Sequence, residues 1–116
     1  MNFVRRPPRI GKAIAGANGV ADILLPPDTR TQAQLLERIN IASTSTTLTP
    51  EVFVYIGDAA VDQNCVDYTP AGKRDVSVNN PAIYVPGTSS LLVRFTGCDV
   101  GAECTVRIQR LSESNA

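Results

Sequence analysis

The sequence has no histidine, and this absence narrows what the protein can do more than any other feature of its 116 residues. Histidine is the side chain that most often acts as a general base near neutral pH, and it is a common zinc ligand. Ser-His-Asp and Cys-His catalytic groups are therefore excluded. Gly-x-Ser-x-Gly, Walker and Gly-x-Gly-x-x-Gly motifs are also missing, and neither lysine, Lys12 nor Lys73, neighbours an obvious nucleophile. We predict that the protein is not an enzyme and uses no cofactor and no metal.

Cysteine is scarce as well. The three cysteines, Cys65, Cys98 and Cys104, cannot all pair within one chain, and they form no Cys-x-x-Cys motif. Three cysteines in 116 residues are also far fewer than a disulfide-stabilised scaffold of this size would contain. The sequence therefore predicts three free thiols, with Cys104 serving as a small buried hydrophobic residue.

Long apolar runs are absent. No stretch approaches the roughly 20 apolar residues that a membrane span needs, and the Arg5-Arg6-Pro7-Pro8 start lacks the apolar core of a signal peptide. Apolar residues nevertheless make up 43% of the chain and charged residues 19%, which is enough to fill the core of one domain. We expect a single domain that folds in a cytoplasm and does not contact a membrane.

The charge is balanced overall, with 11 basic and 11 acidic side chains, but it is unevenly placed. The first twelve residues carry Arg5, Arg6, Arg9 and Lys12 and no acid, so they are net +4, while seven basic and eleven acidic side chains leave the remainder net −4. A net charge of zero argues against a protein built around nucleic acid. The basic segment is better suited to bind the acidic body of a neighbouring copy or of another subunit.

The basic segment also contains Pro7, Pro8 and Gly11 and shows no sustained strand or helix period. We predict an extended arm over residues 1–18 that is ordered only when bound, a β-sandwich domain over 19–112 and a short polar tail over 113–116. Arg5, Arg6, Arg9 and Lys12 are the candidate partner-binding residues, and a solubilising tail is the alternative. Deletion of residues 2–12 should then leave folding intact.

Strand signals recur along the rest of the chain. A helix competes only over 31–39, where Thr31 and Gln34 resemble a capping box. Against the helix, alternating apolar residues run on into a threonine-rich stretch, so we predict a strand over 35–44. Short β-branched or alternating runs bounded by turn residues predict the other strands, over 20–25, 51–56, 65–69, 75–78, 82–85, 91–96 and 104–109. About eight short strands indicate an all-β fold, an antiparallel β-sandwich or a jelly-roll-like barrel.

The last two of these strands are predicted to pair as a hairpin. We predict a pairing that is shifted by one residue from the one in which Cys98 and Cys104 would lie directly opposite each other. In this register Val93 and Phe95 face the row formed by Val106 and Ile108. Cys98 then falls in the loop or on the other face, and a disulfide between the two cysteines is not expected.

Two weaker binding patterns remain as alternatives. Asp58, Asp62, Asn64 and Asp67 could supply oxygen ligands to Ca²⁺, although their spacing is not that of an EF-hand and such residues favour turns for backbone reasons. The chain has no tryptophan, and its three tyrosines, Tyr55, Tyr68 and Tyr84, could form a stacking platform for sugars or bases. Tyr55 and Tyr84 also fit the edge of a core.

Two regions of the chain resemble a known family. They are Leu35 to Ser43 followed by Pro50 to Asp58, and then Asn80 to Gly87, Leu91 to Gly97, Gly101-Ala102 and Arg107 to Gln109. They are similar to small virion structural proteins of tailed bacteriophages, of head-decoration, collar or minor-tail type. The resemblance implies a non-enzymatic β-sandwich that sits in a phage particle as a head or head/tail accessory, with other virion proteins and copies of itself as partners. The alternative is a carbohydrate- or receptor-binding module that uses the loops 58–67 and 97–103.

Overall fold

The computed structural model describes residues 3–27, 32–48, 50–70, 76–78 and 83–113. These residues form nine strands and one short 3₁₀ turn, η1, and within them no helix has the length and apolar character needed to cross a membrane. The elements are β1 (Phe3–Ile14), β2 (Ala21–Leu25), β3 (Gln34–Ser43), β4 (Glu51–Ile56), η1 (Asp62–Asn64), β5 (Cys65–Pro70), β6 (Val76–Val78), β7 (Ile83–Val85), β8 (Leu91–Thr96) and β9 (Glu103–Glu113).

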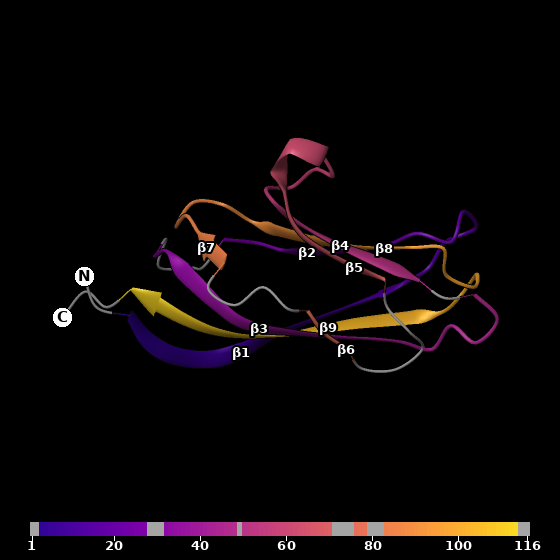
Figure 1. The fold of residues 1–116 in the computed structure, drawn as a ribbon, viewed down its shortest axis with the longest axis horizontal. Helices are drawn as coiled ribbons and strands as arrows, with labels where there is room; N and C mark the ends of the chain where they lie inside the picture. The colour runs from indigo at the N-terminus through magenta and orange to yellow at the C-terminus, as the bar shows by residue number, and fades with distance from the viewer. Residues whose placement is uncertain (1–2, 28–31, 49, 71–75, 79–82, 114–116) are drawn as a thin grey trace.

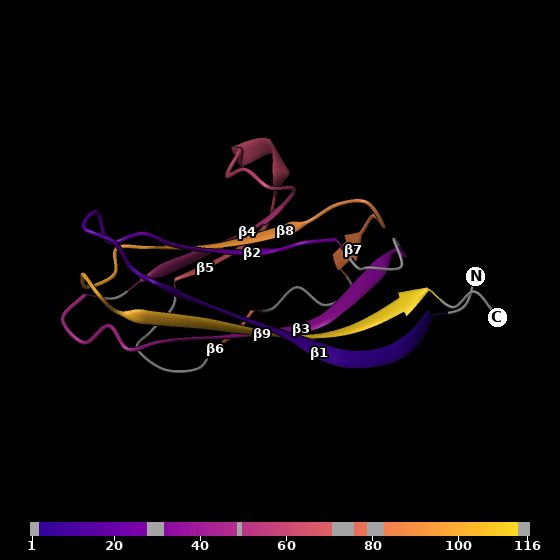
Figure 2. The ribbon, with the colours of Figure 1, turned by 180° about the vertical axis from the view of Figure 1, so that it is seen from behind.

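The strands form two antiparallel sheets that lie face to face (Figure 1). The first sheet has the order β1-β9-β3-β6, with β7 also paired to β3, and the second has the order β2-β8-β4-β5. The loop that holds η1 projects from the outer side of the second sheet, away from the first (Figures 1 and 2). The all-β sandwich predicted from strand spacing is therefore confirmed.

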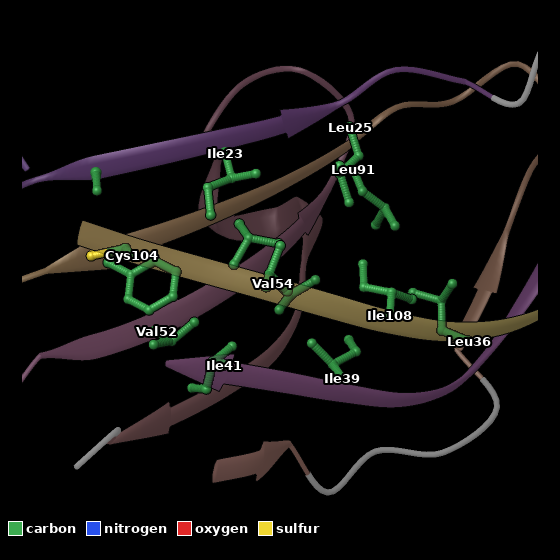
Figure 3. Packing of buried hydrophobic residues seen from close by; sticks show 14 of the residues in the cluster. Ile23, Leu25, Leu36, Ile39, Ile41, Val52, Val54, Leu91, Cys104 and Ile108 are labelled. Atoms are coloured by element: carbon green, nitrogen blue, oxygen red, sulfur yellow. The ribbon is translucent and has the colours of Figure 1, made fainter. Parts of the chain in front are cut away.

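The core lies between the two sheets and consists mainly of aliphatic side chains, together with Phe95 and two cysteines (Figure 3). Ile39 and Ile41 of β3 lie beside Ile108 and Val106 of β9 in the first sheet. They are buried, as are Val52 and Val54 of β4 and Val93 and Phe95 of β8 in the second sheet. Each such side chain contributes roughly 1.5–3 kcal/mol on burial. The choice of a strand over a helix near residues 35–44 is confirmed, since the burial of β3 follows a period of two apart from one irregularity.

The predicted free arm is wrong for residues 3–14. These residues form β1, which pairs with β9 from Phe3↔Glu113 to Ile14↔Glu103. The two prolines sit where the register shifts between Arg6 and Arg9, so the ladder is interrupted where proline has no N–H to donate. β1 therefore belongs to the sandwich, and deletion of residues 2–12 would expose one side of β9 rather than remove a tail.

Gly11 explains how β1 can close against the second sheet. A Cβ atom at this position would overlap the side chain of Ile23 on β2. The two edge strands β1 and β2 thus approach each other closely on one flank of the sandwich because residue 11 has no side chain.

The predicted hairpin between β8 and β9 is also wrong. β8 lies between β2 and β4, whereas β9 lies between β1 and β3, so the connection over residues 97–102 crosses from one sheet to the other. Phe95 and Val106 are not cross-strand neighbours, although both belong to the same buried cluster. The buried space lies between the two sheets. Strands on either side of it alternate apolar and polar residues in the same way as two strands of one hairpin, so the sequence pattern does not distinguish the two arrangements. Cys98 lies in the connection, as expected, and all three cysteines are free thiols.

Candidate partner-binding surface

β1 exposes three large apolar side chains to solvent, and two of them, Ile10 and Ile14, are more than half exposed. Ile10, Lys12 and Ile14 share the outer face of the first sheet, and Ile10 is 69% exposed and Ile14 57% exposed. Isoleucine in a strand normally faces a core, and exposed apolar groups that lie together are typical of interaction sites. The outer face of β1 is therefore a candidate surface for binding a partner protein.

The four predicted site residues make contacts within the chain or line hollows. Arg5 Nη1 lies 2.9 Å from Glu37 Oε1, and Lys12 Nζ lies 3.4 Å from Glu103 Oε1. Arg6 Nε donates a hydrogen bond of 2.8 Å to Ser112 Oγ. The +4 segment is therefore partly neutralised by acids of its own body. Exposed ion pairs of this kind contribute about 0–1 kcal/mol, so acids of another subunit could replace these partners at little cost.

Hollows in the surface flank β1 on both sides and divide the four residues into two pairs. Arg9 and Lys12 line a hollow of about 480 Å³ together with Asp22 and Leu24 of β2. Arg5 and Arg6 line a smaller hollow of about 220 Å³, beside Pro8 and the three β9 residues Arg107, Gln109 and Arg110. A third hollow of about 400 Å³ includes Ile10, Asn40, Thr105 and Arg107. The basic residues are thus spread along β1 and line two separate hollows, and we name this set of four residues the basic strip.

β9 contributes two arginines that the sequence analysis did not select. Arg107 lies opposite Ile10 in the ladder, and Arg110 lies opposite Arg6. Arg110 Nη1 donates to Gln34 Oε1 at 3.1 Å, and its Nε donates to the Pro7 carbonyl at 3.3 Å. The charge of Arg107 and Arg110 is visible in the sequence, but their nearness to the basic residues of β1 depends on the pairing of β9 with β1.

The composition of β1 also affects how two copies could meet. β1 is an edge strand, and an edge strand can pair with the edge of another molecule. Cations along the strand and two adjacent prolines both oppose pairing between identical edges. A contact through the outer face of β1 is therefore favoured over extension of the sheet.

The loops at the opposite end of the sandwich are held by one carboxylate. Asp99 Oδ2 accepts hydrogen bonds from the backbone N–H groups of Thr46 and Thr47 at 2.8 and 2.9 Å, and Oδ1 accepts one from Leu48 at 3.0 Å. These bonds lower the pKa of Asp99 below its ordinary value, with the Thr47 and Thr46 amides as the largest causes. Both oxygens are occupied, so this loop cluster serves as a cap rather than an open ligand site.

The calcium and tyrosine patterns do not form sites in the described part of the chain. No group of three or more His, Cys, Asp or Glu residues there could hold a metal ion. Tyr55 is only 5% exposed on β4, and burial followed by the nearby Cys65 raises its pKa. Tyr84 is exposed but lies on β7 of the other sheet. The side chains of Tyr68 and Asp67 lie outside the described residues.

The second sheet presents a different outer face. Arg94 forms a two-pronged pair with Asp22, at 2.7 Å from Nε to Oδ1 and 2.8 Å from Nη2 to Oδ2. The hydrogen bonds to Asp22 raise the pKa of Arg94. Both charges are thereby matched within the sheet, and among the side chains of this sheet that the structure describes, Leu24 is the exposed large apolar one.

Comparison with known proteins gives a likeness of fold. No family model matches the chain, and no curated protein matches its sequence. A chain in the acidic stable capsid structure of Helicobacter pylori bacteriophage KHP30 has a TM-score of 0.58 and 14% identity, over 97% of this chain and 92% of that chain. The two share a fold over nearly their whole lengths.

Two further structures match more weakly. A chain of infectious bursal disease virus, Gx strain, has a TM-score of 0.39 and 15% identity, over 93% of this chain and 32% of that one. The second N-terminal cellulose-binding domain of Cellulomonas fimi β-1,4-glucanase C has a TM-score of 0.29 and 12% identity, over 99% and 98%. These scores are too low to carry an argument about this protein.

Proposed function

We propose that the protein is a non-enzymatic structural subunit of a bacteriophage particle, a head-decoration or head/tail accessory, and that it assembles through the outer face of β1. The observation that carries the proposal is the pair of exposed isoleucines, Ile10 and Ile14, on a strand that also exposes Arg5 and Lys12. An apolar centre with a charged rim is the usual composition of a subunit interface.

The fold supports this proposal in two ways. The phage capsid chain of KHP30 has the same fold at nearly the same length, which makes a virion role for this small sandwich reasonable. A body built from two packed sheets is also rigid, so repeated copies can present the same face and add many weak contacts. Other virion proteins and copies of the chain itself are the proposed partners, and the virion is the proposed location.

The test is incorporation of a variant into particles that otherwise lack the protein. Ile10→Ser with Ile14→Ser should leave the thermal unfolding of the isolated protein within a few degrees of wild type, because both side chains are solvent-exposed. Incorporation should fall at least tenfold if these side chains form the contact. Val61→Ser is the matched control, since Val61 is an exposed apolar residue just before η1, in the loop on the outer side of the second sheet.

Charge reversal tests the basic residues separately. Arg5→Glu with Lys12→Glu should reduce incorporation, because both side chains are exposed, and raising the salt concentration should weaken the attachment of wild type in the same direction. Normal incorporation of both the isoleucine and the charge variants would overturn the role of β1. A glycan array with and without Ca²⁺ tests the carbohydrate-binding alternative, and saturable binding there would replace the proposal.

A further inference from the structure

Two thiols face each other inside the sandwich. Cys98 Sγ and Cys104 Sγ are 3.8 Å apart, and the residues are 2% and 0% exposed. Cys104 lies on β9 at one end of the core (Figure 3), where Ser43 Oγ of β3 also lies 3.5 Å from its sulfur. The described residues contain no group of three or more metal-ligating side chains, and the short distance places the two thiols to react with each other.

The backbone around the pair belongs to both layers. Cys98 follows β8 of the second sheet, and its N–H donates to the Gly19 carbonyl at 3.0 Å, just before β2 of the same sheet. Cys104 is held between Ala13 of β1 and Ser43 of β3 in the first sheet. A bond between the two sulfurs would therefore join the sheets directly at this end.

We propose that Cys98 and Cys104 form an oxidation-dependent disulfide that staples the two sheets together. The oxidant is a small disulfide such as oxidised glutathione. The Cys98 thiolate attacks one of its sulfurs, which forms a mixed disulfide and releases one glutathione thiolate. The Cys104 thiolate then attacks the Cys98 sulfur, which forms the internal disulfide and releases the second glutathione; the two protons lost from the cysteines end on the two glutathiones.

The surroundings of Cys98 indicate how the first step begins. Residues Val100 and Gly101 in the same connection are exposed, with Val100 at 71%. Burial, followed by the nearby Cys104, raises the pKa of Cys98 to about 12, so the closed structure holds almost no thiolate. The oxidant therefore reacts when the 97–102 connection opens, and the closing of that connection returns Cys104 to the mixed disulfide. The reaction is slow, and it suits a lasting change of environment more than rapid signalling.

This inference needs only the thiol pair and does not rest on the proposed virion role. A chain that folds in a reducing cytoplasm keeps both thiols, whereas the same chain in an oxidising medium acquires the staple. The disulfide closes a loop of only a few residues, so its effect on stability is moderate. We expect a rise in Tm of roughly 5–10 °C on oxidation.

The experiment uses Cys65→Ser, which removes the unrelated third thiol. The folded variant is incubated with oxidised glutathione, quenched with acid, and analysed by intact mass and by thiol counting after denaturation. We expect a mass lower by two hydrogens, no remaining thiols, and a raised Tm that returns to its starting value with dithiothreitol. The matched control, Cys65→Ser with Cys104→Ser, should stop at the mixed disulfide and show no rise in Tm.

Three results would overturn the staple. They are two thiols that persist during incubation with excess oxidant, a mixed disulfide that accumulates in the two-thiol variant, and a disulfide whose formation lowers Tm. Cys65→Ser with Cys98→Ser distinguishes the order of attack. If Cys98 is the first thiol to react, this variant should be modified at least several-fold more slowly than the variant that keeps Cys98.

Discussion

The two ends of the sandwich are built from different interactions. At one end, which we name the turn end, residues 15–20, 44–48 and 97–103 are joined by hydrogen bonds that involve at least one backbone group, such as Ala15 N–H to Ala102 O at 2.8 Å and Thr46 N–H to Asp99 Oδ2 at 2.8 Å. At the other, which we name the arginine end, the first sheet continues as β1, β9 and β3, and side chains of Arg6, Gln34, Arg110 and Ser112 meet.

The difference indicates which end can change its partners. Backbone hydrogen bonds at the turn end depend on the path of the chain, so replacing them would require the loops to unfold. Side-chain bonds at the arginine end can be exchanged by rotation of a few bonds. An assembly contact therefore fits the arginine end and the adjoining face of β1, whereas the turn end serves to hold the sheets together.

The largest expected effect is at Gly19 of the turn end. Gly19 has φ of 73°, and a Cβ there would lie 2.8 Å from the Cys98 carbonyl oxygen. Gly19→Ala should lower the free energy of unfolding by about 2–3 kcal/mol, through backbone strain and the clash together. Gly101→Ala is the matched control, because φ is 81° but no atom lies within 4 Å of the added Cβ. Equal losses in chemical denaturation would show that the close approach contributes nothing.

Ser45 is the next test of the turn end. Its buried hydroxyl accepts from the Asp99 N–H at 3.1 Å and donates to the Leu48 carbonyl at 2.8 Å. Ser45→Ala leaves both groups without this partner and should cost about 1–3 kcal/mol in urea unfolding. Thr88→Ala, at an exposed turn position, should cost less than about 0.5 kcal/mol. A loss at Ser45 as small as that of the control would contradict the role of this hydroxyl.

Asp99 gives the turn end a pH dependence. The pKa of Asp99 is lowered in the folded state from its ordinary value of 3.8, so the unfolded chain takes up a proton at higher pH than the folded one. Its stabilisation is complete above the ordinary pKa and is lost as the pH falls through the folded pKa. Asp99→Asn should therefore lower Tm at pH 7, and the difference from wild type should shrink below about pH 4. A constant difference from pH 7 to pH 3 would exclude this explanation.

The smallest expected effect is at the arginine end. Arg6→Gln removes the 2.8 Å bond to Ser112 and should change the free energy of unfolding by no more than about 1 kcal/mol. The same variant should reduce particle incorporation if the basic strip is part of the contact. A stability loss comparable to that at Gly19 would mean that the arginine end also holds the fold together, and the contrast between the ends would fail.

The strands of the core were predictable because their side chains alternate. β3, β4 and β8 place alternate apolar residues between the sheets, and sequence patterns report such alternation directly. β1 was missed because its strand character depends on β9, about one hundred residues later in the chain. Its own residues include two prolines, a glycine and several cations, which locally indicate an arm.

The site was predictable in part, for a related reason. Arg5, Arg6, Arg9 and Lys12 were selected by charge, but their division between two hollows and the addition of Arg107 require the pairing of β1 with β9. Nothing in the sequence around Asp99 indicates that its carboxylate binds the backbone of residues 46–48. Its partners are backbone N–H groups of a Ser/Thr-rich stretch 51–53 residues away, and no local pattern records such a contact.

The position of β9 has a consequence for biosynthesis. β9 lies between β1 and β3, yet it is the last of the nine strands along the chain. During translation β1 and β3 therefore emerge long before the strand that separates them in the sheet. The first sheet cannot be completed until β9 has left the ribosome, whereas all four strands of the second sheet emerge earlier. Folding that depends on such distant partners is slow for its size, and a chaperone that shields β1 and β3 meanwhile would raise the yield.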